Sequence, residues 1–378
     1  MRFSEEQIQI RDAAREFSER ELAPIAAQWD AKGAFAPGVL ERMGQLGLMG
    51  MCVPEEWGGA GADFTAYTLA IEEVAAAWAA ASSVMSVNNS PLCSALLDWG
   101  SDEQKERFLR PIAQGAVGCF CLTEPHAGSD AGAIRTRAEQ RGNRYVLNGA
   151  KQFITSGSIA KYALVFATTD PTAGKRGISA FIMPTSTPGF NVVAKEKKLG
   201  QRASDTCQIA FEDVELSRDM LLGQEGQGLR VALANLAAGR VAIAAQAVGI
   251  ARAALEAATR YANERETFGT AIVNHQAIRF RLADMATRLE AARQLTLHAA
   301  GMRDEGASCI TEASMAKLFA SETAESICSD AVQIHGGYGY VEGFPVERLY
   351  RDVRVCQIYE GTSDVQRMVI GRSLAESG

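Results

Sequence analysis

The spacing of hydrophobic residues changes twice along the 378-residue chain, and these two changes constrain the fold more than any other feature. Residues 4 to about 118, and those after Gly228, are Ala-rich and apolar at helical spacing. The stretch between them consists of short β-prone segments without intervening helices, which favours an antiparallel sheet. We therefore predict an α+β fold, mainly α, with an N-terminal all-α domain at residues 1–118, a middle β domain at 119–225 and a C-terminal α-helical bundle at 226–378.

Local signals place several of these elements. Ser4 followed by Gln7 predicts a capping box at the start of the first helix. Asn148-Gly149 predicts a hairpin turn. The expected strands are residues 144–147, 162–167 and 177–183, and the expected long helices are residues 229–264, 273–303 and 311–332.

Charge and composition exclude several classes of protein. A net charge of −7 and a pI near 5.4 argue against binding to nucleic acid or an anionic membrane. No run approaches the roughly 18 apolar residues of a spanning helix, and the N-terminus lacks a signal or transit pattern, so we expect a cytoplasmic protein. The eight cysteines form no Cys-x-x-Cys pair and are expected to be buried thiols, and with four scattered histidines we expect no metal site.

Two segments of the middle region contain residues suited to holding a planar ligand. Residues 120–130 run from an apolar strand end into a Gly-Ser-Asp turn, which can present backbone N–H groups and hydroxyls to a ligand. In residues 148–157, Phe153 can pack on a ring system while Thr155 donates a hydrogen bond. An ordinary tight turn and an ordinary buried strand explain these two segments equally well.

Two segments near the C-terminal helices contain residues suited to a phosphate-bearing ligand. Arg265 closes a helix and offers a planar guanidinium to a pyrophosphate, although a solvated charge at a helix end is the simpler interpretation. The glycines of residues 333–340 allow close backbone approach to a ligand. This loop lacks the preceding strand and following helix of a dinucleotide fingerprint, and His335 within it has a structural or a functional role.

The last segment contains a carboxylate in the turn before the final helix. Ser363 with Gln366 predicts a capping box, which places Glu360 just ahead of a helix N-terminus, and Gly361 leaves room for a ligand. Burial would raise the pKa of this carboxylate, whereas the helix dipole would lower it, and the sequence does not decide between them. A carboxylate that only serves the helix N-terminus is the structural alternative.

In this order and spacing, the five segments strongly resemble the acyl-CoA dehydrogenase family, and the likeness covers nearly the whole chain. Residues 121–130 and 333–366 are similar to the family's two signature regions. The resemblance implies a helical domain, a middle antiparallel β-barrel or sandwich and a C-terminal four-helix bundle. It also implies FAD as cofactor, an acyl-CoA substrate, electron-transfer flavoprotein as electron acceptor, and a homotetramer.

The resemblance also implies which residues hold the cofactor. Those expected to line the flavin are Phe120, Leu122, Thr123, Ser129, Phe153, Ile154 and Thr155. Those expected to reach the FAD pyrophosphate of a neighbouring subunit are Arg265, Thr267, Gln276, Gln333, Gly336 and Gly337. Thr362 and Asp364 are expected to contact the cofactor beside the base.

Glu360 corresponds by the same resemblance to the catalytic base, which removes the α-proton while a hydride leaves the β-carbon, giving a trans-2-enoyl-CoA. Some family members place the base on the long helix, but the corresponding residue here is Gly239. The implied substrate contacts are Ser129, Arg240 and Gly361. Residues 86–90 are similar to the pocket-floor helix of butyryl-type members, so a short C4–C6 straight or branched acyl-CoA is expected.

Several alternatives stay open at this point. Phe153 stands where Trp is commoner, and Ala237 replaces an Asp that many members carry, so CoA placement or flavin tuning can differ. Within the same fold, the alternatives are a medium-chain or branched-chain dehydrogenase, an acyl-CoA oxidase and a desulfinase. A monooxygenase is expected to lack the Glu-Gly-Thr-Ser turn. A non-catalytic helical interaction protein would purify without colour, whereas bound FAD is yellow.

Overall fold

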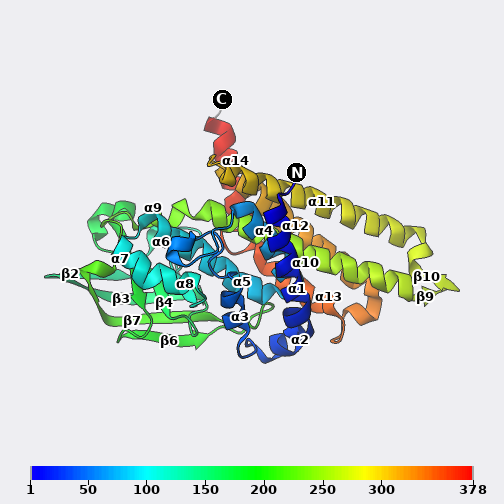
Figure 1. The fold of residues 1–378 in the computed structure, drawn as a ribbon, viewed down its shortest axis with the longest axis horizontal. Helices are drawn as coiled ribbons and strands as arrows, with labels where there is room; N and C mark the ends of the chain where they lie inside the picture. The colour runs from blue at the N-terminus through cyan, green and yellow to red at the C-terminus, as the bar shows by residue number, and fades with distance from the viewer. Residues whose placement is uncertain (1, 377–378) are drawn as a thin grey trace.

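The computed structural model describes residues 2–376, and the chain starts with helices that pack against the rest of the molecule (Figure 1). Ser4 Oγ accepts a hydrogen bond from Gln7 N at 3.1 Å and Ser4 N donates to Gln7 Oε1 at 2.9 Å, so the predicted capping box is confirmed. The helices of this part are α1 (Glu5–Phe17), α2 (Ala23–Lys32), α3 (Val39–Gln45), α4 (Phe64–Ala77), α5 (Ala79–Val87), α6 (Ser94–Trp99), α7 (Asp102–Gln104) and α8 (Arg110–Ala113).

The middle of the chain forms one eight-stranded sheet in the order β6-β7-β3-β2-β4-β5-β8, with β1 paired to β4. The strands are β1 (Gly118–Cys121), β2 (Arg137–Arg141), β3 (Arg144–Thr155), β4 (Tyr162–Thr168), β5 (Ile178–Pro184), β6 (Phe190–Lys195), β7 (Thr206–Ser217) and β8 (Leu221–Leu222). The expected antiparallel pairing holds for most neighbouring strands of this sheet, but the sheet is mixed, because β1 and β2 both run parallel to β4. The chain reaches β4 from β1 by way of the β2–β3 hairpin, and this longer connection permits parallel pairing.

The predicted hairpin turn at Asn148-Gly149 is also wrong, because both residues lie inside the continuous strand β3. The pair sits at a β-bulge, where the register of β3 and β7 shifts between Leu147 and Gly149. Asn148 Nδ2 donates to the Asp213 carboxylate at 2.9 Å, and Asp213 N donates to Asn148 Oδ1 at 2.9 Å. A Cβ on Gly149 would lie 2.6 Å from Thr136 Oγ1, so this glycine serves close packing on β2 and not a turn.

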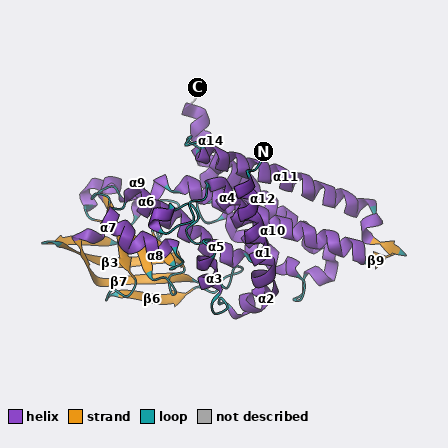
Figure 2. Cartoon of the chain, in the orientation of Figure 1, coloured by secondary structure: helices purple, strands orange, loops and turns teal. Residues whose placement is uncertain are grey.

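The last part of the chain is helical and contains the longest helices (Figure 2). α10, α11 and α12 lie side by side, and the shorter α13 and α14 pack on α12. The elements are α9 (Gly228–Ala234), α10 (Leu236–Glu264), β9 (Glu266–Thr267), β10 (Thr270–Ala271), α11 (Gln276–Asp304), α12 (Ile310–His335), α13 (Pro345–Val353) and α14 (Ser363–Glu376). The three predicted long helices are confirmed, except that Asn235 separates α9 from α10.

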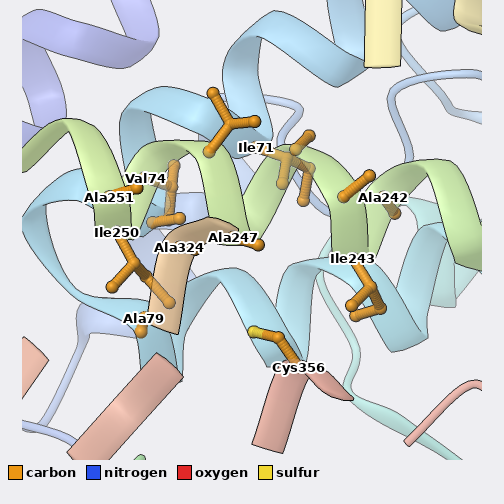
Figure 3. Packing of buried hydrophobic residues seen from close by; sticks show 14 of the residues in the cluster. Ile71, Val74, Ala79, Ala242, Ile243, Ala247, Ile250, Ala251, Ala324 and Cys356 are labelled. Carbon is orange, nitrogen blue, oxygen red and sulfur yellow. The ribbon is translucent and has the colours of Figure 1, made fainter. Parts of the chain in front are cut away.

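The hydrophobic core consists of two clusters. One joins the first helices to the last ones around α10, as with Ile71 of α4 and Ile243 and Ile250 of α10 in Figure 3. The other fills the sheet and the short helices α6 and α8. The stretch Gly228–Glu264 is long and apolar enough to cross a membrane, but 83% of its apolar window is buried inside the protein. Its hydrophobicity is therefore that of a core helix, and it positions whatever lies beside it.

Candidate active site

The Glu360 carboxylate lies directly against helix α10 at Gly239. A Cβ built on Gly239 would lie 2.7 Å from Glu360 Oε2 and 3.1 Å from its Cδ. Glycine in a helix interior destabilises the helix by about 1 kcal/mol relative to alanine. Here the missing side chain leaves the space that the carboxylate occupies. The carboxylate accepts no hydrogen bond from any of residues 2–376, so its oxygens are available to accept a proton.

Two buried cations face this carboxylate from neighbouring helices. Arg240 on α10 is 6% exposed and donates from Nη1 to Ser314 Oγ at 3.1 Å. Lys317 on α12 is 0% exposed. Burial raises the pKa of Glu360, while Arg240 and Lys317 lower it, and the net shift is upward. A raised pKa brings a carboxylate closer to neutral pH, which suits a proton acceptor.

The turn that carries Glu360 differs in one detail from the predicted capping box. The N-cap of α14 is Thr362, whose Oγ1 accepts from Val365 N at 3.3 Å. The Ser363 hydroxyl has no partner among residues 2–376. Gln366 does not return to a capping serine, because its Nε2 donates to the carbonyls of Glu360 at 3.1 Å and Gly361 at 2.8 Å. The predicted Ser363–Gln366 box is therefore wrong by one residue.

The expected flavin-lining residues gather at the ends of β1 and β3. Phe120 packs on Phe166 with ring centroids 4.8 Å apart, and Thr123 O accepts from Gln152 N at 2.8 Å. Phe153 sits on a bulge with φ of 58° and is 62% exposed, so its ring is open to a planar ligand. Thr155 is partly buried, and Ser129 is exposed. The Ile154 side chain is only 2% exposed and packs in the core of the sheet, so it can offer a ligand its backbone alone.

Sequence reasoning missed the ion pair that holds this segment. Lys151 is fully buried, and its Nζ lies 2.7 Å from Glu124 Oε1 and 3.0 Å from the Leu122 carbonyl. Glu124 also accepts from the backbone N–H groups of Arg135 at 2.7 Å and Thr136 at 3.0 Å. Burial would raise the pKa of Glu124, but Lys151 and these donors hold it below its ordinary value. Strand β3 also carries Arg144, Asn148 and Gln152, so no signal in the sequence marks Lys151 in particular as buried and paired.

The expected pyrophosphate-binding residues surround a separate pocket of about 620 Å³. Arg265 lies 5.9 Å from the centre of the Tyr338 ring, and Thr267 Oγ1 lies 3.0 Å from His275 Nε2. Gly336 and Gly337 open the pocket's edge. Among residues 2–376, the lining of this pocket contains no carboxylate. A guanidinium, a hydroxyl, an imidazole and open backbone therefore line it without an anion of the protein beside them. This donor set fits a pyrophosphate.

Three further expected residues do not line the pocket beside Arg265. Gln276 and Gln333 are exposed, at the start of α11 and in the last turn of α12. Asp364 is exposed in the first turn of α14 and lies 3.5 Å from Arg367. His335 Nδ1 donates to the Ala331 carbonyl at 2.8 Å, and the ring stacks on Tyr261 with centroids 4.3 Å apart, so His335 supports the pocket wall.

The two expected groups of cofactor contacts lie at opposite ends of one chain. The sheet that carries Phe153 occupies one end of the molecule, and the β9–β10 hairpin beside Arg265 occupies the other (Figures 1 and 2). Arg240 on α10 and Glu360 in the adjoining turn lie between these two ends. The fold therefore brings the base and Arg240 together, but it does not bring the pyrophosphate group to the flavin group.

A buried polar cluster lies next to the base. Gln246 Nε2 donates to Ser82 Oγ at 2.8 Å and Ser83 Oγ at 2.9 Å, and Gln246 Oε1 accepts from the hydroxyl of Tyr359. In the nearby residues 86–90, the asparagine side chains form hydrogen bonds to backbone groups. For example, Asn89 bridges Met51 N at 2.6 Å and the Leu48 carbonyl at 2.8 Å.

Comparison with known proteins identifies the family. Models of the acyl-CoA dehydrogenase N-terminal, middle and C-terminal domains match residues 4–116, 119–214 and 226–375. The chain is 48% identical to an acyl-CoA dehydrogenase of Bacillus subtilis, covering 99% of both chains. It is 47% identical to the mitochondrial short-chain specific acyl-CoA dehydrogenase of Mus musculus, covering 97% of this chain and 90% of the relative. It is also 45% identical to a 3-(aryl)acrylate reductase of Clostridium sporogenes, covering 99% and 100%.

Solved structures agree with this assignment. A structure of the electron transferring flavoprotein of Acidaminococcus fermentans matches with a TM-score of 0.98 at 45% identity, covering 99% of both chains. Butyryl-CoA dehydrogenase from Megasphaera elsdenii matches with a TM-score of 0.97 at 40% identity, covering 99% of both chains. These matches confirm the predicted fold class and the predicted cofactor, FAD. The chain belongs to the acyl-CoA dehydrogenase family of FAD-dependent oxidoreductases.

Proposed function

We propose that this protein removes the α-proton of a short acyl-CoA with Glu360 and forms a trans-2-enoyl-CoA. The observation that carries the proposal is the Glu360 carboxylate seated against Gly239, unpaired and facing two buried cations. The raised pKa of Glu360 suits proton abstraction near neutral pH. Bound FAD supplies the acceptor for the β-hydride.

The chain's own groups perform the proton chemistry. The α-proton of a thioester is weakly acidic, so the charge that develops on the carbonyl oxygen needs a hydrogen-bond donor. The Glu360 backbone N–H has no hydrogen-bond acceptor among residues 2–376 and belongs to the same residue as the carboxylate that takes the proton. Arg240 supports the ionised base from the adjacent position on α10. Gly361, at φ of 88°, keeps side-chain bulk away from the thioester.

We assign the flavin to Phe120, Leu122, Thr123, Ser129, Phe153 and Thr155, and the pyrophosphate to Arg265 and its pocket on a neighbouring copy. The opposite placement of these two groups supports an assembly in which each FAD touches two chains. A homotetramer satisfies this requirement. The domain division at residues 118 and 225 and the cytoplasmic location stay predictions.

The proposed substrate is a C4–C6 acyl-CoA, straight or short-branched. The relatives named for short-chain and butyryl substrates support it. The polar cluster of Gln246, Ser82 and Ser83 supports it as well, because a long apolar chain passing beyond the base would displace buried hydrogen bonds. We propose electron-transfer flavoprotein as the acceptor, in line with the matching structure from Acidaminococcus fermentans.

The base is tested by anaerobic bleaching of the flavin with butyryl-CoA. Glu360→Gln is expected to keep its yellow FAD and to lose bleaching, because an amide does not accept the proton. Bleaching at the wild-type rate would remove Glu360 from the role. Arg265→Ala is expected to lower flavin content, and unchanged content would contradict the pyrophosphate assignment.

The substrate and direction are tested with wild-type protein. A bleaching series from C4 to C16 acyl-CoAs is expected to be fastest at C4–C6, and a preference for C12 or longer would overturn the short-chain proposal. Reduced protein is expected to pass electrons to electron-transfer flavoprotein and to form little hydrogen peroxide in air. Rapid peroxide formation would favour an oxidase, and net reduction of an enoyl substrate would favour a reductase like the Clostridium relative.

A further inference from the structure

The turn that carries Glu360 adopts a backbone conformation that needs external support. Glu360 has φ of 53°, in the left-handed region that side chains disfavour, and Gly361 follows with φ of 88°. A non-glycine residue in this region costs on the order of 1–3 kcal/mol and persists only where its surroundings fix it. The groups that fix this turn therefore set the position of the carboxylate.

Two fully buried side chains from different helices hold the carbonyls of this turn. Lys317 Nζ on α12 donates to the Gly361 carbonyl at 2.6 Å. Gln366 on α14 donates to the same carbonyl and to that of Glu360. Lys317 and Gln366 are both 0% exposed, so neither hydrogen bond competes with bulk water.

A neutral donor would hold this carbonyl equally well, so the hydrogen bond alone does not explain why a charged side chain is buried here. No carboxylate lies within ion-pair distance of Lys317 in residues 2–376. Burying an ammonium without such a partner is unfavourable. The carboxylate that faces Lys317 beyond pairing distance is Glu360, and Glu322 on α12 is already paired with Arg367 at 2.6 Å.

The other titratable groups around the two residues do not change charge near neutral pH. Burial raises the pKa of Cys356, beside Lys317, to about 12, and burial raises the pKa of Tyr67, which faces Glu360 from α4. Arg240 stays cationic. Burial lowers the pKa of Lys317 itself to about 8, so below that pH its ammonium is the second cation acting on Glu360.

We propose that Lys317 is a positioning residue for Glu360, whose ammonium fixes the Glu360–Gly361 turn and keeps the neighbouring carboxylate ionised at neutral pH. This inference rests on the proposed role of Glu360 as the base. It assigns two linked tasks to one side chain, which holds the turn through the Gly361 carbonyl and stabilises the anionic base through its charge.

The test uses the FAD-loaded protein and butyryl-CoA, with the rate of anaerobic flavin reduction measured against pH. Lys317→Met removes the charge and the donor, and Lys317→Gln keeps a donor without charge. In both variants the acid limb of the profile is expected to move up by about one pH unit, which lowers the rate about tenfold below the pKa of the base. Lys317→Met is expected to lose further rate at every pH, because the turn is also released. The infrared carboxylic-acid band that disappears in Glu360→Gln is expected to persist to higher pH in Lys317→Met.

A matched control is Lys198→Met, which removes another partly buried lysine that donates to Ser204 O and Thr206 Oγ1 and does not face Glu360. Its acid limb is expected to coincide with that of the wild type. An unshifted limb in both Lys317 variants, or an equal shift in Lys198→Met, would overturn the inference. The base assignment fails separately, if Glu360→Gln still reduces the flavin. Should Lys317→Met not fold, Lys317→Gln and the infrared band decide.

Discussion

Two fully buried lysines hold the two ends of the proposed active site, and they differ in what they face. Lys151 in the sheet lies 2.7 Å from the Glu124 carboxylate and also donates to the Leu122 carbonyl. Lys317 in the helical bundle donates only to the Gly361 carbonyl. Burial lowers the pKa of both lysines, but Glu124 opposes this at Lys151, whereas the carboxylate that most opposes it at Lys317 is Glu360, the proposed base.

The charge of Lys151 therefore has a structural role, whereas the charge of Lys317 is suited to a role in the proposed reaction. The Lys151–Glu124 pair is closed, since each charge has its partner and the carboxylate also accepts two backbone N–H groups. Such a pair holds the backbone that we propose to line the flavin, and neither of its charges takes part in the proposed reaction. Lys317 faces a carboxylate that gains a proton during the proposed reaction. Its electrostatic environment therefore changes with each turnover.

The largest expected effect is on the free energy of unfolding. If removal of either lysine changed it equally, the distinction between the two lysines would fail. Lys151→Met leaves Glu124 buried without its cation, which is expected to lower the free energy of unfolding by about 3–5 kcal/mol. Lys317→Met removes an unpaired buried charge, and Gln366 still donates to the Gly361 carbonyl. Its loss is expected to be about 1 kcal/mol. Urea unfolding of both holoproteins measures the difference.

A second variant identifies the cause of that loss. Glu124→Gln combined with Lys151→Met is expected to recover part of the stability, because the amide is uncharged and its single oxygen still accepts from one of the Arg135 and Thr136 N–H groups. Equal losses in Lys151→Met and Lys317→Met, or no recovery in the double variant, would contradict the closed ion pair.

The next effect concerns the position of the base and leaves both lysines in place. Gly239→Ala puts a methyl group 2.7 Å from Glu360 Oε2, so the carboxylate has to leave its present position. A displacement of this kind is expected to lower the flavin-reduction rate about 100-fold. Stability is expected to change little, because alanine favours the helix.

The control for this variant is Gly371→Ala, another helical glycine, on α14, with nothing within 4 Å of an added Cβ. It is expected to reduce its flavin at the wild-type rate. Unchanged activity in Gly239→Ala would show that the Glu360 carboxylate does not act from its position against Gly239 of α10.

The sequence predicted what depends on neighbours along the chain and missed what depends on distant ones. The Ser4–Gln7 cap needs only residues within one helical turn, and it is confirmed. The Asn148-Gly149 pair has the local preference of a turn, but its partner Asp213 lies across the sheet and turns it into a bulge. The Ser363 cap failed because the adjacent Thr362 offers the same hydroxyl and Gln366 is used by the Glu360 turn.

The dependence on residues distant in the sequence also explains why the contacts of the two lysines were not predicted. Lys317 stands on the buried face of α12, four residues after Ala313 and three before Ala320, with Ser314 and Ser321 on the same face. Its partner Gly361 is 44 residues away, so no local pattern identifies the contact. The FAD residues were reached only by resemblance to a family. Their division between the two ends of the chain depends on the packing of whole domains.

The smallest expected effect sharpens the comparison through pH. The folded pKa of Lys317, about 8, lies below the unfolded value of about 10.4. Between these two values the unfolded chain binds more protons than the folded one, so this lysine makes stability rise with pH. The raised pKa values of buried cysteines such as Cys328 and Cys356 have the opposite effect. The contribution of Lys317 is therefore measured as the difference between wild type and Lys317→Met. That difference is expected to shift in favour of the wild type by about 1 kcal/mol between pH 8 and pH 9. If the difference stays constant over this interval, Lys317 does not titrate there. Its ammonium would then be compensated as fully as that of Lys151.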